Sequence, residues 1–339
     1  MADTKIALKP ADFQSSQEPR WCPGCGDYAI LKQVQTVLAE KGYQPHEVVF
    51  FSGIGCSSRF PYYMNTYGMH TIHGRAPAIA TGLKVMRPDL SVWVITGDGD
   101  ALAIGGNHLI HALRRNVDMN ILLFNNEIYG LTKGQYSPTS ELYKVTKSSP
   151  WGTAESPFNP VLLALSAGAT FVARTIDREV KHQRDILKQA DDHKGVSFVE
   201  IYQNCNVFND GAFADFTDKK KQPETTIFLK HGEPAIFGTN RDKCLVVENG
   251  KLKVAHIKPD GELPENVYVH DETSLEKALL VATLFGPADQ VPRPFGIFYR
   301  VTKPTYEEQL RQQRERAKRK MGEVSLQDLL YGSETWQVK

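Results

Sequence analysis

The chain has 339 residues, enough for roughly two domains of ordinary size. Its 40 lysines and arginines nearly balance its 39 aspartates and glutamates, so the formal net charge is +1 and nothing indicates nucleic acid as a partner. No run of about 18 apolar residues occurs, which argues against a membrane span. The polar N-terminus also lacks the apolar core of a secretory signal, so we expect a cytoplasmic enzyme.

Residues 1–20 are polar and contain two prolines, which is typical of an N-terminal arm. From there to about residue 205, helical apolar spacing alternates with short apolar runs. This alternation predicts an α/β fold with a mostly parallel sheet that helices cover on both faces. The predicted helices span 28–40, 76–86, 160–169 and 178–190, and the predicted strands span 48–51, 92–96, 121–124, 170–172 and 197–202. We expect the second of these helices to pack closely through Ala78, Ala80 and Gly82.

The pattern changes after residue 205. An irregular stretch carries the lysines 219–221, and residues 243–256 resemble a hairpin around Asn249-Gly250. A short helix is expected at 274–285, a break at 292–294, and a basic, polar helix at 306–321 that is solvated or covers a partner. We therefore divide the chain into the arm 1–20, a cofactor-binding domain 21–225 and a C-terminal extension 226–339.

The most informative stretch is 92–135. One strand ends in Gly97-Asp98-Gly99-Asp100, and the next strand along the chain ends in Asn125-Asn126. Because the carboxyl ends of parallel strands meet at one edge of a sheet, these oxygen ligands should lie together, and they suit Mg²⁺. Gly97 and Gly99 would let backbone amides approach a phosphate at a helix start. The stretch predicts a magnesium-diphosphate site.

Four of the five cysteines form a second candidate site. Cys22 and Cys25 make a C-x2-C pair in a turn, Cys56 follows a strand in a glycine turn, and Cys205 follows the last clear strand. Four thiolates suit a [4Fe–4S] cluster or a structural zinc ion, and a redox pair is the third alternative. Cys244 lies in an apolar run and is interpreted as a small buried hydrophobe.

The GDG triplet, followed after 25 residues by NN, resembles the shared motif of thiamine-diphosphate enzymes. That resemblance implies that Asp98, Asn126 and the carbonyl of Ile128 bind Mg²⁺. More specifically, four segments resemble the beta subunit of 2-oxoacid:ferredoxin oxidoreductases of the 2-oxoglutarate type. They are WCPGCG (21–26), SGIGCSSRFP (52–61), HTIHGRAPAIATGLK (70–84) and NNEIYGLTKGQYSPTS (125–140), and the dense resemblance spans about 15–215.

The resemblance implies a thiamine-diphosphate-binding fold and a set of ligands. It favours the [4Fe–4S] cluster over zinc, with Cys22, Cys25, Cys56 and Cys205 as its ligands. The implied diphosphate contacts are Ile54, Gly55, Cys56, Ser57, His73, Gly74, Gly99, Asp100, Gly130 and Leu131. His73 would donate a hydrogen bond or shuttle a proton beside the diphosphate, and its alternative is a structural histidine.

Arg59 is the predicted determinant of substrate choice. 2-Oxoglutarate has a distal carboxylate, which a guanidinium binds through two hydrogen bonds. Arg59 follows Cys56 by three residues, and Lys133 is the second candidate. For both residues the alternative is a surface salt bridge.

One required group is missing from the chain. Enzymes of this family need a glutamate near the aminopyrimidine, and the family places it on an alpha subunit with most coenzyme A contacts. We therefore expect this chain to be inactive alone and to form an alpha–beta heterodimer or a dimer of heterodimers. Electrons should leave to a separate ferredoxin, because no compact ferredoxin-like cysteine run is present.

The implied reaction converts 2-oxoglutarate and coenzyme A to succinyl-CoA and CO₂, and its reverse fixes CO₂, as in a reductive tricarboxylic acid cycle. Three alternatives stay open. The first is the same reaction on pyruvate or another 2-oxoacid. The second is a non-catalytic zinc-binding scaffold, and the third is a non-redox thiamine enzyme.

Overall fold

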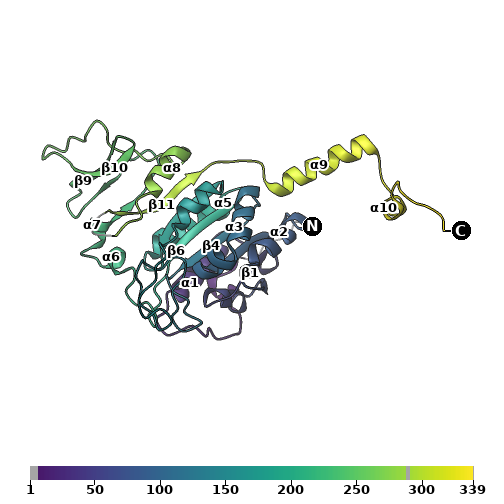
Figure 1. The fold of residues 1–339 in the computed structure, drawn as a ribbon, viewed down its shortest axis with the longest axis horizontal. Coiled ribbons are helices and arrows are strands. Elements are labelled where there is room, and N and C mark those ends of the chain that lie inside the picture. Colours follow the sequence, from purple (N-terminus) through teal and green to yellow (C-terminus); the bar gives the residue numbers. More distant parts are fainter. Residues whose placement is uncertain (1–6, 288–290, 339) are drawn as a thin grey trace.

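The computed structural model describes residues 7–287 and 291–338 (Figure 1). An eight-stranded sheet lies at its centre, with the strand order β2-β1-β3-β4-β6-β5-β11-β7. Every neighbouring pair in this sheet is parallel except β5 and β11, which are antiparallel. The strands are β1 (Val48–Ser52), β2 (Tyr67–His70), β3 (Ser91–Gly97), β4 (Asn120–Asn125), β5 (Phe171–Ile176), β6 (Ser197–Tyr202), β7 (Thr226–Phe228) and β11 (Arg293–Arg300).

Helices cover both faces of the sheet, so the predicted α/β class is confirmed. Alternate residues of one strand point to opposite faces: Val92 and Val94 of β3 join one core, whereas Trp93 and Ile95 join the other. Burial on both sides explains why the strands read as continuous apolar runs. The first core contains α2 (Ala76–Met86), α3 (Gly106–Arg115), α4 (Pro160–Ser166) and α8 (Leu275–Ala282); the second contains α1 (Asp27–Glu40) and α5 (Val180–Asp192).

Three strands of the sheet, β2, β7 and β11, were not predicted. β2 is an edge strand whose side chains are largely exposed, so it carries no apolar pattern. β11 begins beside Pro292 and Pro294, which we interpreted as a break. Proline is tolerated at the start of a strand, and the following residues of β11 are buried. Strand β5 is also longer than the predicted 170–172.

The segment 226–339 contributes to the main sheet as well as to its surroundings. Because β7 and β11 belong to that sheet, it crosses the boundary that we placed between residues 225 and 226. The predicted hairpin is confirmed as β9 (Lys243–Glu248) and β10 (Lys251–His256), with Asn249 and Gly250 at positive φ. Strand β8 (Ile236–Phe237) completes this small sheet. Two short helices, α6 (Ala214–Thr217) and α7 (Gln222–Thr225), interrupt the stretch expected to be irregular.

The two ends of the chain differ. Residues 1–6 of the predicted arm lie outside the described part, and in the rest a short helix, η1 (Pro10–Phe13), buries Phe13 in the core. At the other end, α9 (Tyr306–Met321) and α10 (Leu326–Tyr331) extend away from the body (Figure 1). Beyond its first residues α9 is exposed, so its role as a partner-covering helix stays a prediction.

One packing prediction for α2 is wrong in part. Ala80 is buried as expected, but Ala78 and Gly82 are exposed, and nothing would meet a Cβ added at Gly82. Their small size therefore serves no close contact within the described chain. In the two described ranges, no helix combines the length and apolarity that a membrane crossing requires.

Candidate functional site

The predicted site residues meet at one edge of the main sheet. Strands β1, β3, β4 and β6 are neighbours and parallel, so their carboxyl ends lie side by side. The residues that follow these ends are Cys56, Asp98, Asn126 and Cys205, respectively. They line two adjoining cavities, of about 180 and 130 Å³. Both cavities share Cys56, Asn126, Gly130, Leu131 and Gln203.

The smaller cavity contains the residues expected to hold the diphosphate and magnesium. Gly74 is the one expected contact that does not line it, because its backbone N–H donates to Asp100 Oδ1 at 2.7 Å. The expected residues that do line the cavity are Ile54, Gly55, Cys56, Ser57, His73, Asp98, Gly99, Asp100, Asn126, Ile128, Gly130 and Leu131. A short π-helix, η4 (Asp100–Ile104), begins directly after Gly99, and such segments are frequent at functional sites.

Asp98 is a buried carboxylate held by two hydroxyls. Ser137 Oγ and Thr139 Oγ1 donate to its Oδ2 atom at 2.5 and 2.6 Å. Burial raises the pKa of Asp98 to about 6, while the hydroxyl bonds act in the opposite direction. Ser137 and Thr139 were not predicted as site residues, although the hydroxyl-rich turn that contains them lies within the last quoted segment.

Asn126 and Ile128 sit on a tight turn after β4. The Ile128 N–H donates to Asn126 Oδ1 at 3.2 Å, and Glu127 between them has a φ of 55°. Asn209 Nδ2 donates to the Asn126 carbonyl at 2.9 Å and ties the turn to the loop after β6. With Asp98, the turn brings a carboxylate, an amide oxygen and a backbone carbonyl to one cavity, a donor set that fits Mg²⁺.

Asp100 holds two loops of the site together. Its Oδ1 atom accepts the Ile54 N–H at 3.0 Å, and its Oδ2 atom accepts Thr96 Oγ1 at 2.7 Å. A Cβ added at Gly53 would lie 1.9 Å from Oδ2, so this position requires glycine. Because both carboxylate oxygens already accept hydrogen bonds from the protein, any contact with a diphosphate would come from the backbone of Asp100. The sequence alone did not reveal this structural role of the side chain.

His73 also contacts Asp100. Its Nδ1 atom lies 2.6 Å from Asp100 Oδ1, and because an ionised carboxylate only accepts, Nδ1 carries the hydrogen. The imidazole is 38% exposed and lines the cavity, so Nε2 is the nitrogen available to a ligand. In His73, Nδ1 thus has a structural contact with Asp100, and Nε2 is the atom that could serve the predicted function.

Position 99 requires glycine because the ring of Tyr129 lies against it. A Cβ at this position would lie 2.1 Å from Cε1 of Tyr129, whose hydroxyl donates to the Gly99 carbonyl at 3.2 Å. This contact fixes the loop after β4 against the start of η4. It adds Tyr129 to the residues that shape the cavity.

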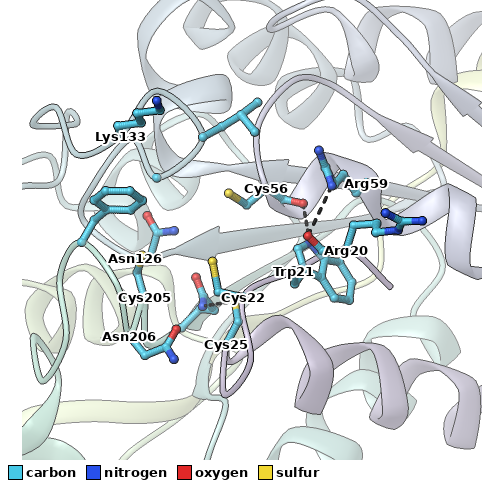
Figure 2. Close-up of a pocket in the computed structure, with 14 residues that line it drawn as sticks. Arg20, Trp21, Cys22, Cys25, Cys56, Arg59, Asn126, Lys133, Cys205 and Asn206 are labelled. Atoms are coloured by element: carbon cyan, nitrogen blue, oxygen red, sulfur yellow. Dashed lines mark hydrogen bonds between the residues drawn. The ribbon is translucent and has the colours of Figure 1, made fainter. Parts of the chain in front are cut away.

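The four expected cysteines line the larger cavity, and Figure 2 shows Cys22, Cys25, Cys56 and Cys205 around it. The sulfurs of Cys56 and Cys205 lie 3.5 and 3.6 Å from the point where a Cβ at Gly130 would stand. Within the described ranges, no three His, Cys, Asp or Glu side chains are grouped closely enough to hold a single metal ion. The four thiols thus line one cavity at the edge of the sheet.

Two of the thiols are shifted toward their protonated forms. Burial raises the pKa of the Cys25 thiol well above its ordinary value and that of Cys56 to about 12, and nearby Asp27 adds to both shifts. Arg59 opposes the shift of Cys56. Metal binding would therefore have to displace protons from these sulfurs.

Polar contacts join the cysteine loops. Trp21 Nε1 donates to the Cys56 carbonyl at 2.7 Å, and Asn206 Nδ2 donates to the Pro23 carbonyl at 2.5 Å. Gln203 Nε2 lies 3.2 Å from the Cys25 sulfur. The fifth cysteine, Cys244, is buried in β9, as expected.

Three cations lie at the rim of the larger cavity. Figure 2 shows Arg20 and Arg59 on one side of the cysteines and Lys133 on another. Arg59 Nη1 donates to the Arg20 carbonyl at 3.3 Å, and the guanidinium makes no salt bridge to any residue that the structure describes. Arg59 also lines an adjacent surface pocket with Ile54 and Gly55. The role of Arg59 in substrate choice stays a prediction.

Comparison with known proteins agrees with this geometry. Residues 53–201 match the family model described as thiamine pyrophosphate enzyme, C-terminal TPP binding domain. The 2-oxoglutarate oxidoreductase subunit KorB of Mycobacterium tuberculosis is 53% identical over 334 residues, which cover 97% of this chain and 88% of that protein. The chain belongs to the KorB family of 2-oxoglutarate oxidoreductase subunits.

Two more members support the assignment. The 2-oxoglutarate synthase subunit KorB of Methanocaldococcus jannaschii is 39% identical over 73% of this chain and 89% of its own length. The solved 2-oxoglutarate:ferredoxin oxidoreductase of Magnetococcus marinus, with 2-oxoglutarate, coenzyme A and succinyl-CoA bound, superposes with a TM-score of 0.77. It is 35% identical, and the match covers 98% of both chains. The KorB fold is thus shared over nearly its full length, and the chain is an oxidoreductase subunit that acts with partner subunits.

Proposed function

We propose that this chain is the beta subunit of a 2-oxoglutarate:ferredoxin oxidoreductase. The complex would convert 2-oxoglutarate, coenzyme A and two oxidised ferredoxins to succinyl-CoA, CO₂, a proton and two reduced ferredoxins. The observation that carries the proposal is the shared wall of the two cavities, in which Cys56 belongs to both. A thiamine enzyme without electron transfer would not need four cysteines beside its diphosphate cavity.

The residues of each cavity have separate tasks in this proposal. Asp98, Asn126 and the Ile128 carbonyl would hold Mg²⁺, and the cysteine thiolates would hold a [4Fe–4S] cluster. Bound thiamine diphosphate supplies an electron sink for decarboxylation. The glycine turn Ile54–Ser57 would bind the diphosphate, and His73 would present Nε2 to it. Asp100 keeps this turn and the His73–Gly74 turn in place through its buried carboxylate.

Arg59 would bind the distal carboxylate of 2-oxoglutarate. It lines a surface pocket with Ile54 and Gly55, a pocket that Glu18 also lines. The second candidate function, the same reaction on pyruvate, needs no such cation because pyruvate has no distal carboxylate. The alpha subunit would supply the pyrimidine-binding half, its glutamate and most coenzyme A contacts, in an alpha–beta heterodimer or a dimer of heterodimers in the cytoplasm. The reverse direction would fix CO₂.

Copurification tests the proposal. The chain is expressed with its alpha subunit under anaerobic conditions, and the complex is assayed for reduction of ferredoxin or methyl viologen. We expect reduction that depends on both 2-oxoglutarate and coenzyme A, and about four iron atoms per beta chain. A complex that contains stoichiometric zinc without iron, or that prefers pyruvate to 2-oxoglutarate, would contradict it. The isolated chain should be inactive.

A further inference from the structure

A turn of buried hydroxyls lies against the expected magnesium ligand. The segment 137–140, Ser-Pro-Thr-Ser, belongs to a long loop that is mostly exposed, with Trp151 95% exposed. Within this loop, the side chains of Ser137, Thr139 and Ser140 are only 2 to 3% exposed. Buried hydroxyls need hydrogen-bond partners, so their contacts show what the turn holds.

Two of these hydroxyls converge on one carboxylate oxygen. Ser137 Oγ and Thr139 Oγ1 lie 2.5 and 2.6 Å from Asp98 Oδ2. The third hydroxyl, of Ser140, donates to the Glu127 carbonyl at 2.6 Å and accepts the Ser137 N–H at 2.8 Å. The turn is therefore fixed both to Asp98 and to the loop that contains the other expected ligands. Both donors reach the same oxygen, so they fix the carboxylate from one side.

A fully buried ion pair sets the orientation of the neighbouring amide. Arg174 Nε donates to Glu200 Oε2 at 2.7 Å, and both side chains have no exposed area. Asn125 Nδ2 donates to Glu200 Oε1 at 2.8 Å, which turns Asn125 Oδ1 toward Thr139 at 2.8 Å. This contact fixes which end of the amide is the oxygen, because a carboxylate accepts only from the NH₂ group.

The Thr139 hydroxyl has one hydrogen and two acceptors. Asn125 Oδ1 also accepts the Glu127 N–H at 3.2 Å, whereas Asp98 Oδ2 carries charge. The charged acceptor makes the stronger bond, so the hydrogen goes to Asp98. The path of hydrogen bonds from the buried pair then ends at Asn125, and the hold on the Asp98 carboxylate comes from the hydroxyls of Ser137 and Thr139.

We propose that Ser137 and Thr139 are positioning residues that hold the Asp98 carboxylate ready for a divalent cation before the cofactor binds. The inference rests on the proposed function, in which Asp98 is a magnesium ligand. Hydrogen bonds to a ligand from groups that do not touch the metal orient that ligand, and their loss typically weakens metal binding 10- to 100-fold. The two hydroxyls act through Asp98 and would not contact the metal themselves.

The test measures cation binding, with Mn²⁺ as a paramagnetic probe for Mg²⁺. The intact complex with its alpha subunit is stripped of cofactor and metal, and the Kd of Mn²⁺ is measured by electron paramagnetic resonance in the presence of thiamine diphosphate. Ser137→Ala and Thr139→Val should each raise the Kd about ten-fold, and the double variant should raise it further. Thr139→Ser, which keeps the hydroxyl, should restore binding to about the wild-type value.

Matched controls separate positioning from general stability. Ser148→Ala removes an exposed hydroxyl from the same loop and should leave the Kd, the iron content and the Tm unchanged. In the two test variants, saturating Mg²⁺ should restore most of kcat, because the defect lies in metal affinity. If Thr139→Val lowers the Tm or the iron content, its Kd no longer reports on positioning alone. The Kd of Ser137→Ala then tests the inference.

The outcomes distinguish this inference from the proposed function. Wild-type Kd values in Ser137→Ala and Thr139→Val would overturn the positioning role while the proposed function stands. A wild-type complex that binds no Mn²⁺ with thiamine diphosphate would overturn the proposed function first. An equal Kd increase in Thr139→Ser and Thr139→Val would show that side-chain shape, and not the hydroxyl, matters, and would also overturn the inference.

Discussion

The two adjoining cavities differ in how far the protein organises them without a ligand. On the diphosphate side, hydroxyl and backbone donors already surround the carboxylates of Asp98 and Asp100. On the cysteine side, burial raises the pKa of Cys25 and Cys56, and Cys22 is exposed. In the proposed roles, the chain would thus already hold the oxygen ligands before metal binds, whereas the thiols of Cys25 and Cys56 would lose their protons on metal binding. The comparison predicts that cluster assembly stabilises its loops and that magnesium binding changes little around it.

Loss of a cysteine should have the largest effect. Cys205→Ser is expected to reduce the iron content from about four atoms per chain to near zero and to abolish ferredoxin reduction, because a four-thiolate site loses a ligand. If the two cavities are organised independently, the Kd of Mn²⁺ with thiamine diphosphate should change by no more than a few-fold. Iron analysis of the complex measures the cluster content, and Mn²⁺ titration measures the Kd. The control is Cys244→Ala, which removes a thiol outside the site and should leave the iron content unchanged. Retention of a full cluster in Cys205→Ser would refute the ligand assignment.

Removal of the Asp98 carboxylate should impair the diphosphate cavity and leave the cysteine cavity intact. Asp98→Ala is expected to weaken Mg²⁺-dependent binding of thiamine diphosphate by at least about 100-fold, because the site loses its one charged ligand. The iron content and the visible absorption of the cluster should stay at wild-type values. Calorimetric titration with the cofactor and Mg²⁺ measures the affinity. Asp260→Ala, at an exposed loop position, is the control, and an unchanged affinity in Asp98→Ala would refute the magnesium assignment.

Substrate choice should depend on Arg59 at the rim of the larger cavity. Arg59→Ala is expected to lower kcat/KM for 2-oxoglutarate about 10- to 100-fold, the loss typical of a hydrogen bond between charged groups. It should leave the low activity on pyruvate nearly unchanged, since pyruvate offers no distal carboxylate. Steady-state kinetics with both substrates gives the ratio. Lys133→Ala is the matched comparison at the same rim, and if it, rather than Arg59→Ala, changes the preference, the assigned cation is the wrong one.

The sequence predicted the strands whose apolar pattern lies within the strand itself, and it missed those placed by contacts with distant parts of the chain. The strands β1, β3, β4 and β6 were predicted because burial on both faces leaves a local apolar run. The exposed edge strand β2 leaves none, and β11 is placed in the sheet by its pairing with β5, more than 100 residues earlier in the chain. Helix packing is similarly non-local, so small residues in α2 did not reveal which of them are exposed.

The same distinction holds in the site. The expected ligands follow strand ends, so the order of strands in the sheet brings them together. The contacts that position those ligands were not predicted, because they act across long sequence separations: Ser137 and Thr139 were not among the expected site residues, and Asp100 was expected only as a diphosphate contact. Ser137 is 39 residues from Asp98, and Asp100 binds the Ile54 N–H across 46. Hydroxyl, glycine and aspartate residues occur in every turn, so their type alone does not identify such contacts.

The pH dependence of metal binding gives the smallest effect and the sharpest test of the comparison. Burial raises the pKa of Asp98 to about 6 in the metal-free protein. Mg²⁺ binds the carboxylate and not the acid, so below about pH 6 a proton competes with the metal. As the pH falls below about 6, the apparent Kd of Mn²⁺ should rise about ten-fold for each unit of pH. For an aspartate of ordinary pKa, this rise would begin about two pH units lower.

The sign of the stability effect is opposite to that of an ion-paired carboxylate. Because its pKa is raised on folding, Asp98 stabilises the metal-free fold fully below its ordinary pKa, and this contribution is lost as the pH rises through about 6. Mn²⁺ titrations of the complex between pH 5 and 7 measure the binding effect, with Asp98→Asn as the variant that cannot titrate. Asp98→Asn should bind weakly and with a Kd independent of pH over this range. A wild-type Kd that is equally flat would mean that the hydroxyls of Ser137 and Thr139 hold the carboxylate ionised against its burial, and the diphosphate side would then be even more fully organised than its pKa indicates.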